Sequence, residues 1–193
     1  MVSYRRMRVV GGRLRSRTIL APLSSSFIRP TSDRLRESLF NILGHRFGSL
    51  EGLSVLDLFA GTGALGIEAL SRGANIAVFV DSSKESTSLI YKNLSSLGLS
   101  RFAFVLHSHA NRLGYPSIIP PFDLVLADPP YGKGLAEDAL LAVVSSGLLA
   151  DKAIIILEEA LGVSINLPKN FILETERYYA STAIRFYRVD ACS

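Results

Sequence analysis

The sequence has little of the chemistry that disulfides or metal centres require. It contains one cysteine and three histidines in 193 residues. A single cysteine, Cys192, excludes a disulfide within the chain. The histidines are His45, His107 and His109, and no further ligand follows them with the spacing of a zinc site. We therefore expect no bound metal.

Long apolar runs are also missing. No stretch approaches the roughly 18 apolar residues of a membrane helix, and no apolar stretch of a secretory signal follows the first arginines. Hydrophobic residues still make up 48% of the chain, which at this length is enough for a core that needs no disulfides or metal ions to stabilise it. These features predict a cytoplasmic, globular protein with no membrane partner.

Lysine and acidic residues are scarce at the start of the chain. Residues 1–46 hold ten arginines, no lysine and two acids, Asp33 and Glu37. This segment therefore carries +8, and the remainder must carry −4 to give the net charge of +4. Concentrated positive charge indicates a polyanionic partner, and guanidinium groups bind phosphate in bidentate fashion. A solvated basic surface without a partner is the alternative.

We interpret residues 1–46 as an N-terminal extension and residues 47–193 as the main domain. The extension is predicted as a strand, a turn at Gly11–Gly12, a second strand and a helix over residues 31–46. Arginine recurs at every second position from Arg13 to Arg17, so in a strand these side chains would share one face. The candidate contacts to the polyanion are Arg13, Arg15, Arg17, Arg29 and Arg34.

From Leu53 onward, short apolar runs alternate with helical patterns. Runs such as residues 153–157 (AIIIL) do not alternate in polarity, which is expected of parallel strands buried on both faces. The last two strands have no helix between them and predict an antiparallel hairpin at the sheet edge. We predict an α/β fold with a doubly wound, Rossmann-like sheet. The predicted strands are 54–59, 76–80, 102–106, 122–127, 153–157, 171–179 and 182–189, and the predicted helices are 64–72, 84–97 and 135–149.

A glycine-rich loop, residues 57–63 (DLFAGTG), follows the first strand of this sheet. Glycines let a ligand approach the backbone, and the next helix presents its N-terminal amides to it. Asp81 comes 20 residues after Gly61, where an acid can bind both hydroxyls of a ribose. Asp57 would repel a pyrophosphate but suits the amino and sulfonium groups of S-adenosylmethionine. A tight strand–helix turn with a capping acid is the alternative.

Further candidates for the same ligand lie at the end of the third strand. There, residues 107–110 (HSHA) offer a polar side chain and a backbone amide to an adenine ring, although an ordinary polar loop has the same composition. A nicotinamide-dependent oxidoreductase would use a similar loop, but Asp57 argues against it. The candidate cofactor-binding residues are Asp57, Phe59, Gly61, Gly63, Asp81, Ser82, His109 and Ala110.

The segment Asp128-Pro129-Pro130-Tyr131 follows the fourth strand, where ligands of such sheets bind. The prolines fix the backbone and leave carbonyls without competing amide donors. A carboxylate beside a carbonyl suits an exocyclic NH₂ group, and an aromatic ring gives a base a stacking surface. These four residues are the candidate catalytic site, with a plain Pro-Pro turn as the alternative.

The chain resembles the bacterial 16S rRNA (guanine-N2)-methyltransferases of the RsmD type from about Met7 to the end. The matching stretches are the glycine loop, residues 128–131, 8–12 (RVVGG), 29–41 (RPTSDRLRESLFN) and 182–187 (TAIRFY). The resemblance implies a class I methyltransferase fold, S-adenosylmethionine as cofactor and methylation of one guanine N2. It implies ribosomal RNA as partner, within the small subunit or its assembly intermediate. His109 departs from the Asp or Asn usual at its position.

Two other functions stay open. Adenine-N6 or cytosine-N4 methyltransferases acting on DNA usually carry a sizeable target-recognition segment, and no such insertion is present here. A non-catalytic RNA-binding module would be expected to have lost Asp128 or Gly61, and both are present.

Overall fold

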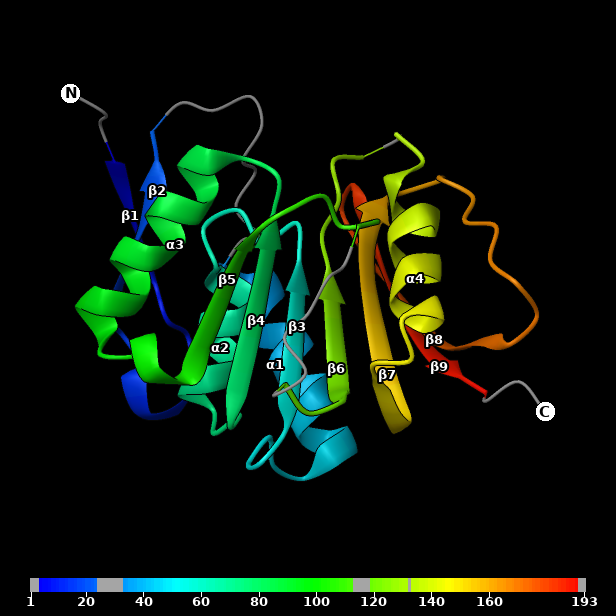
Figure 1. Ribbon diagram of the computed structural model, residues 1–193, viewed down its shortest axis with the longest axis horizontal. Coiled ribbons are helices and arrows are strands. Elements are labelled where there is room, and N and C mark those ends of the chain that lie inside the picture. The colour runs from blue at the N-terminus through cyan, green and yellow to red at the C-terminus, as the bar shows by residue number, and fades with distance from the viewer. Residues whose placement is uncertain (1–3, 24–32, 113–118, 132, 191–193) are drawn as a thin grey trace.

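Seven strands form the main sheet of the computed structural model, which describes residues 4–23, 33–112, 119–131 and 133–190. They are β3 (Ser54–Leu58), β4 (Ile76–Asp81), β5 (Ala103–His107), β6 (Phe122–Ala127), β7 (Leu149–Ala160), β8 (Phe171–Tyr179) and β9 (Thr182–Val189). Their order in the sheet is β5-β4-β3-β6-β7-β9-β8 (Figure 1). Strands β3 to β7 are parallel, and β9 is antiparallel to β7 and β8. The predicted hairpin at the sheet edge is confirmed.

Helices cover both faces of this sheet, which is why its strands are apolar on both sides. The helices are α1 (Asp33–Phe47), α2 (Ala64–Ser71), α3 (Lys84–Leu97) and α4 (Leu135–Ser145). Residues of α1, α2 and α3 share one core with Val55 and Phe79, whereas α4 shares the other core with Val125 and Ile155. The predicted doubly wound α/β fold is therefore confirmed.

Several predicted boundaries differ from the structure by one residue, and the predicted helix 135–149 and strand 153–157 differ by more. The helix predicted to reach residue 149 ends at Ser145, because Gly147 adopts a left-handed φ of 67° and turns the chain. The strand predicted from residue 153 begins at Leu149 and continues to Ala160. The apolar Leu148 and Leu149 extend the helical pattern in sequence, but only the glycine decides where the helix stops.

The N-terminal segment forms a separate antiparallel hairpin of β1 (Tyr4–Arg8) and β2 (Thr18–Pro22). The prediction that Arg13, Arg15 and Arg17 line one face of a strand is wrong. Arg13 lies in the 3-10 turn η1 (Gly12–Leu14), and all three arginines are exposed in the connection between the strands. Their alternation with other residues resembles a strand pattern, but contacts from α2 draw this backbone into a turn.

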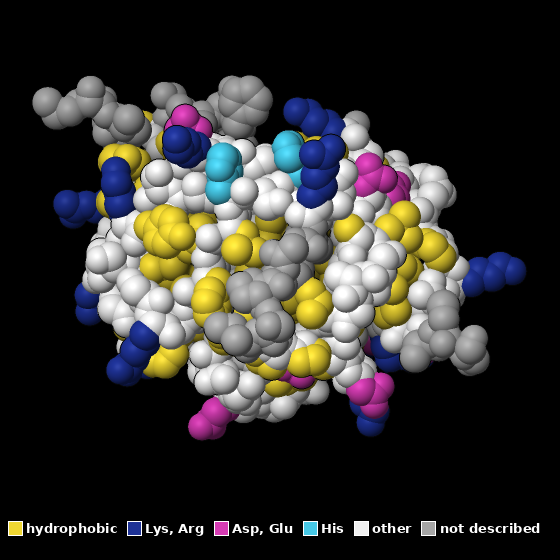
Figure 2. Space-filling model, in the orientation of Figure 1, with side chains coloured by type: hydrophobic (Ala, Val, Ile, Leu, Met, Phe, Trp, Pro, Cys, Tyr) yellow, Lys and Arg dark blue, Asp and Glu magenta, His cyan; other side chains and the backbone are white. Residues whose placement is uncertain are grey.

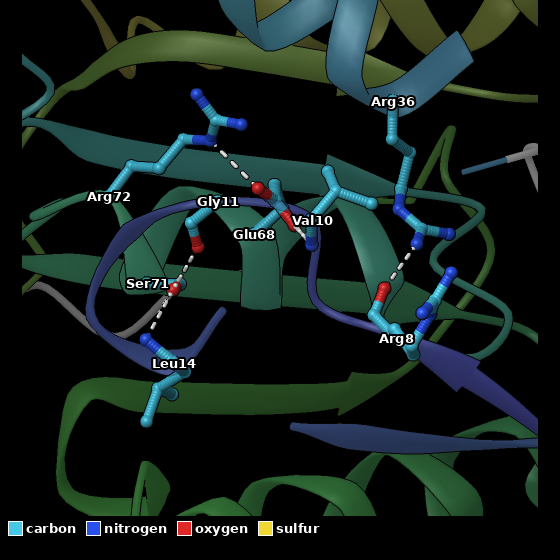
Figure 3. A network of polar contacts seen from close by, with 8 residues as sticks. All are labelled: Arg8, Val10, Gly11, Leu14, Arg36, Glu68, Ser71 and Arg72. Carbon is cyan, nitrogen blue, oxygen red and sulfur yellow. Dashed lines mark hydrogen bonds and ion pairs between the residues drawn. The ribbon is translucent and has the colours of Figure 1, made fainter. Parts of the chain in front are cut away.

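The contacts from α2 are made by two of its buried side chains, shown in Figure 3. Ser71 accepts a hydrogen bond from the Leu14 amide at 3.0 Å and donates one to the Gly11 carbonyl at 2.6 Å. Glu68 accepts from the Val10 amide at 2.8 Å and pairs with Arg72 at 2.7 Å. Helix α2 thus satisfies backbone groups of the turn that have no strand partner.

Helix α3 and helix α1 hold the two strands of the hairpin in a similar way. The Asn93 amide group accepts from the Leu20 amide at 2.9 Å and donates to the Leu20 carbonyl at 3.0 Å. The Arg36 guanidinium is fully buried and donates to the Arg8 carbonyl and to Asp33 (Figure 3 shows the Arg8 contact). Arg36 therefore serves the fold, and its charge does not belong to a surface that meets a polyanion.

Candidate active site

The glycine loop joins β3 to α2 and is held by Asp57 from within the strand. The Asp57 side chain is 1% exposed, and its Oδ2 atom accepts a hydrogen bond from the Gly66 amide at 2.9 Å. Gly63 adopts a left-handed φ of 77° at the start of α2. A Cβ atom on Gly66 would lie 2.4 Å from the Phe79 ring, so the first turn of α2 packs directly on β4. This close packing requires glycine.

Asp57 is a carboxyl group without an adjacent cation on the described residues. Its pKa is raised from the usual 3.8 to about 8, chiefly by burial, while the Gly66 hydrogen bond lowers the pKa and the charge of Asp81 raises it. A buried acid of this kind favours either a proton or a positively charged ligand nearby. The predicted role of Asp57 toward a cationic ligand stays a prediction.

Asp81 ends β4, and both of its carboxylate oxygens are fixed by backbone amides. Oδ2 accepts from the Gly61 amide and Oδ1 from the Ser83 amide, each at 2.8 Å. Each oxygen retains a further lone pair for a ligand hydroxyl. The carboxylate is half-buried at the carboxyl end of the strand, which is the position predicted for binding a ribose.

A pocket lies beside Asp81 at the carboxyl ends of the strands. Its lining includes predicted residues from four separate segments: Phe59, Asp81, Ser82, His109, Ala110 and Pro130. It also includes Ser108, from the predicted stretch 107–110, and residues that sequence reasoning missed: Val80, Asn111, Leu135 and Asp138. Phe59 has a left-handed φ of 57°, a conformation that costs free energy in a residue other than glycine and is concentrated at functional sites. Asp57 of β3 and the loop residues Gly61 and Gly63 do not line this pocket.

The Asp-Pro-Pro-Tyr segment begins directly after β6, on the same edge of the sheet. Asp128 is half-buried, Pro129 is buried and Pro130 is exposed toward the pocket. The Tyr131 hydroxyl donates to Glu158 Oε1 at 2.8 Å and lies 3.1 Å from the Thr182 hydroxyl. Burial chiefly raises the pKa of Tyr131; the Thr182 hydrogen bond lowers this pKa and the charge of Glu158 raises it, and the net rise keeps the phenol a donor.

Sequence reasoning missed Glu158 and Thr182. Glu158 is 8% exposed on β7 and Thr182 is 4% exposed on β9. The sequence carries one signal for the first of them, because a carboxylate directly after the apolar run 153–157 is expected near the carboxyl end of a strand. Nothing in the sequence pairs either residue with Tyr131, since their contact depends on the order of β6, β7 and β9.

The predicted arginine contacts lie away from this edge. The turn that carries Arg13 packs on the last residues of α2, at the amino ends of the strands. The Arg13 and Arg101 guanidinium groups lie 5.3 and 4.6 Å from the centre of the Phe102 ring, just before β5. Figure 2 shows dark blue side chains along the left side, where Figure 1 places the hairpin and α3. Arg34 is exposed on α1, and Arg29 lies outside the described residues.

The described part of the chain offers no cluster of three His, Cys, Asp or Glu side chains for a metal ion. Its helices are also too short or too polar to cross a membrane.

A sheet of this order, with a glycine loop after β3 and Asp-Pro-Pro-Tyr after β6, defines a class I methyltransferase. A family model described as conserved hypothetical protein 95 matches residues 7–188. The ribosomal RNA small subunit methyltransferase D of Escherichia coli K12 is 34% identical over 186 residues, covering 96% of this chain and 91% of the relative. The protein of that name from Haemophilus influenzae is 34% identical, covering 94% and 93%. The chain belongs to this family, the ribosomal RNA small subunit methyltransferase D family.

Solved structures agree with this assignment. A putative methyltransferase from Escherichia coli superimposes with a TM-score of 0.81 at 34% identity, covering 97% of this chain and all of that chain. A putative methylase from Haemophilus influenzae gives 0.78 at 31% identity, covering 96% and 99%. The likeness therefore extends over the N-terminal hairpin as well as the main sheet.

Proposed function

We propose that this protein uses S-adenosylmethionine to methylate the exocyclic N2 of a guanine in small-subunit ribosomal RNA. The observation that carries the proposal is the convergence of Asp81, Asp128 and Tyr131 at one edge of the sheet, in a chain 34% identical to ribosomal RNA small subunit methyltransferase D. The protein would act in the cytoplasm, where such RNA is assembled.

The residues fit the cofactor. When bound, S-adenosylmethionine supplies an electrophilic methyl group on a positively charged sulfur. Asp81 has lone pairs for the ribose hydroxyls, and the Ala110 amide and the His109 ring, which line the same pocket, would meet the adenine. The buried Asp57 would release its proton when a cation binds on the amino-acid side and would then supply the compensating negative charge. These roles follow the chemistry of each donor set and the family resemblance.

Asp128 and the two prolines would act on the target base. The amino lone pair of guanine is delocalised into the ring, so the nitrogen is a poor nucleophile. Asp128 accepts from the N1–H and N2–H groups together and takes up the proton that N2 loses. The ring of Tyr131 stacks on the base, which must be unstacked from its neighbours to enter the site. Most of the rate enhancement would come from this positioning and its electrostatics.

The choice of guanine over adenine rests on the family. Adenine-N6 enzymes also place Asp at the position of Asp128, so the carboxylate alone does not separate the two bases. The decisive experiment is mass mapping of modified nucleosides in ribosomal RNA from cells that lack this protein. Loss of one N2-methylguanine is expected, and an unchanged guanine pattern with loss of a methylated adenine would overturn the proposal.

Asp128→Ala tests the site directly. We expect this variant to bind S-adenosylmethionine with unchanged affinity in calorimetry, because Asp128 follows β6 whereas Asp81, the proposed ribose ligand, ends β4. Methyl transfer should fall by at least about 10²-fold, the usual range for removing a positioned acid–base group. Normal turnover would refute the assigned role, and failure of the wild-type protein to bind S-adenosylmethionine would refute the cofactor.

The exposed arginines of the hairpin turn would hold the RNA backbone. Replacing Arg13, Arg15 and Arg17 by alanine should weaken binding and make it less sensitive to salt. The slope of log binding constant against log salt should fall by roughly 0.7 to 0.9 for each phosphate that the variant no longer neutralises. Lys152→Ala on β7, which is also exposed, is the matched control for removing positive charge. An unchanged slope in the triple variant would exclude the turn from the RNA interface.

A further inference from the structure

The hydroxyl group of Tyr131 is held between two buried side chains from different strands. It donates its single proton to Glu158 Oε1 at 2.8 Å, which leaves the Thr182 hydroxyl, at 3.1 Å, to donate to the phenol oxygen. The two partners lie on neighbouring antiparallel strands, where Ala160 pairs with Thr182. The phenol is therefore fixed from two directions by residues of the rigid sheet.

The strand register also places Glu158 next to the start of the same loop. Ala127, the last residue of β6, pairs with Leu157 of β7, so Asp128 leaves the sheet beside Glu158. The segment from Asp128 to Tyr131 thus leaves the sheet at β6 and is attached again to β7 and β9 through its last side chain.

We propose that Glu158 and Thr182 form a clamp that positions the Tyr131 ring for methyl transfer. The clamp thereby sets the width of the slot between that ring and Asp128. This inference rests on the proposed function, in which Asp128 and Tyr131 hold the target base. Two prolines fix the backbone of the loop and the clamp fixes its aromatic end, so the slot is formed before the base arrives.

A preformed slot matters because the target base must leave its stacked neighbours in the RNA before it enters the site, which already costs free energy. A tyrosine free to change rotamer would have to be immobilised at each binding event, which opposes binding. A displacement of about 1 Å at a reacting group can reduce the rate by about 10²-fold. The buried carboxylate is itself unfavourable without a donor, and the phenol supplies one. The phenol is therefore one of the groups that stabilise the buried Glu158 carboxylate.

The test measures methyl transfer to small ribosomal subunits from cells that lack the protein, with saturating S-adenosylmethionine. Tyr131→Phe keeps the ring and removes only the hydroxyl, and Glu158→Ala removes the acceptor. Each should lower kcat by about 10- to 100-fold, the range for losing alignment of reacting groups, with KM for S-adenosylmethionine unchanged. Glu158→Gln keeps an acceptor oxygen and should recover most of the rate. Wild-type kcat in Tyr131→Phe would overturn the proposal.

The double variant Tyr131→Phe with Glu158→Ala separates this clamp from two independent effects. If both residues act through one hydrogen bond, the double variant is no slower than the slower single variant. A loss equal to the product of the two single losses would refute the clamp. Glu159→Gln is the matched control, because this neighbouring buried carboxylate bonds the Ala160 amide on the other face of the strand, and its kcat should equal that of the wild type.

Two further measurements keep the result interpretable. Thr182→Val is close to isosteric and should also reduce kcat. This variant tests the clamp even if Glu158→Ala fails to fold, and an unchanged kcat in Thr182→Val would count against the clamp. If Asp128→Ala is inactive while Tyr131→Phe and Glu158→Ala are fully active, the positioning role fails and the proposed function stands. If Asp128→Ala is itself fully active, the proposed function fails.

Discussion

The buried Asp57 should make the stability of the protein depend on pH in an unusual direction. The folded carboxyl group has its pKa raised from 3.8 to about 8, so it keeps its proton over a range in which the unfolded chain has lost it. The folded state then binds more protons, and the free energy of unfolding falls as pH rises from about 4 to about 8. The stabilisation from this group is complete below about pH 4 and is lost above about pH 8.

The size of the effect follows from the shift. One pKa unit corresponds to about 1.4 kcal/mol, so about four units give a ceiling of about 5 to 6 kcal/mol. Local relaxation and water entry reduce this, and about 2 to 4 kcal/mol is a realistic loss. Asp57→Asn mimics the neutral acid, keeps an acceptor for the Gly66 amide and cannot ionise. Relative to the wild type, this variant should gain about 2 to 4 kcal/mol between about pH 5 and pH 8.

The assay is urea unfolding, followed by circular dichroism, of both proteins without cofactor at about pH 5 and pH 8. Asp151→Asn is the control, because Asp151 is exposed and its loss should leave the pH dependence within about 0.5 kcal/mol of the wild type. Parallel pH curves for the wild type and Asp57→Asn would show that Asp57 is ionised in the folded protein and would refute the reasoning.

Two further predictions concern packing and buried charge. Gly66→Ala places a Cβ atom 2.4 Å from the buried Phe79 ring and should destabilise by about 1 to 3 kcal/mol in the same urea assay, whereas Gly44→Ala on α1, where nothing lies within 4 Å, should stabilise by about 0.5 to 1 kcal/mol. Equal effects at the two glycines would contradict the packing. Glu68→Gln leaves Arg72 without its ion-pair partner and should cost about 2 to 4 kcal/mol, with faster proteolysis of the hairpin. Wild-type resistance to protease would argue against the attachment of the hairpin through Glu68.

The sequence predicts the main sheet well because its strands are decided locally. The bounds of β6, β8 and β9 match the predicted ranges. The residues that form each strand and the turn residues that end it are neighbours in the sequence, so a local pattern indicates both. The hairpin turn departs from its prediction for the opposite reason. Its conformation depends on Glu68 and Ser71, more than fifty residues further on. A local sequence pattern does not indicate hydrogen-bond partners so far along the chain.

The same division holds for the candidate site. Asp57, Asp81 and Asp128 each follow or occupy a predicted strand, so parallel strand order alone brings them to one edge. Glu158 and Thr182 join Tyr131 only through the order of the last strands, which the sequence does not specify. Arg36 resembles one more surface cation in sequence, and its contacts with the Arg8 carbonyl and Asp33 are visible only in the fold.

The attachment of the hairpin to the helices has a consequence for protein engineering. Several backbone groups of the hairpin have no partner within it, and Glu68, Ser71 and Asn93 of the main domain form hydrogen bonds with them. Grafting this hairpin onto another methyltransferase of the same fold therefore requires those three acceptor positions on the host, together with an equivalent of Arg36. Conversely, deleting the hairpin from this chain would expose Glu68, Ser71 and Asn93 and remove their hydrogen-bond partners.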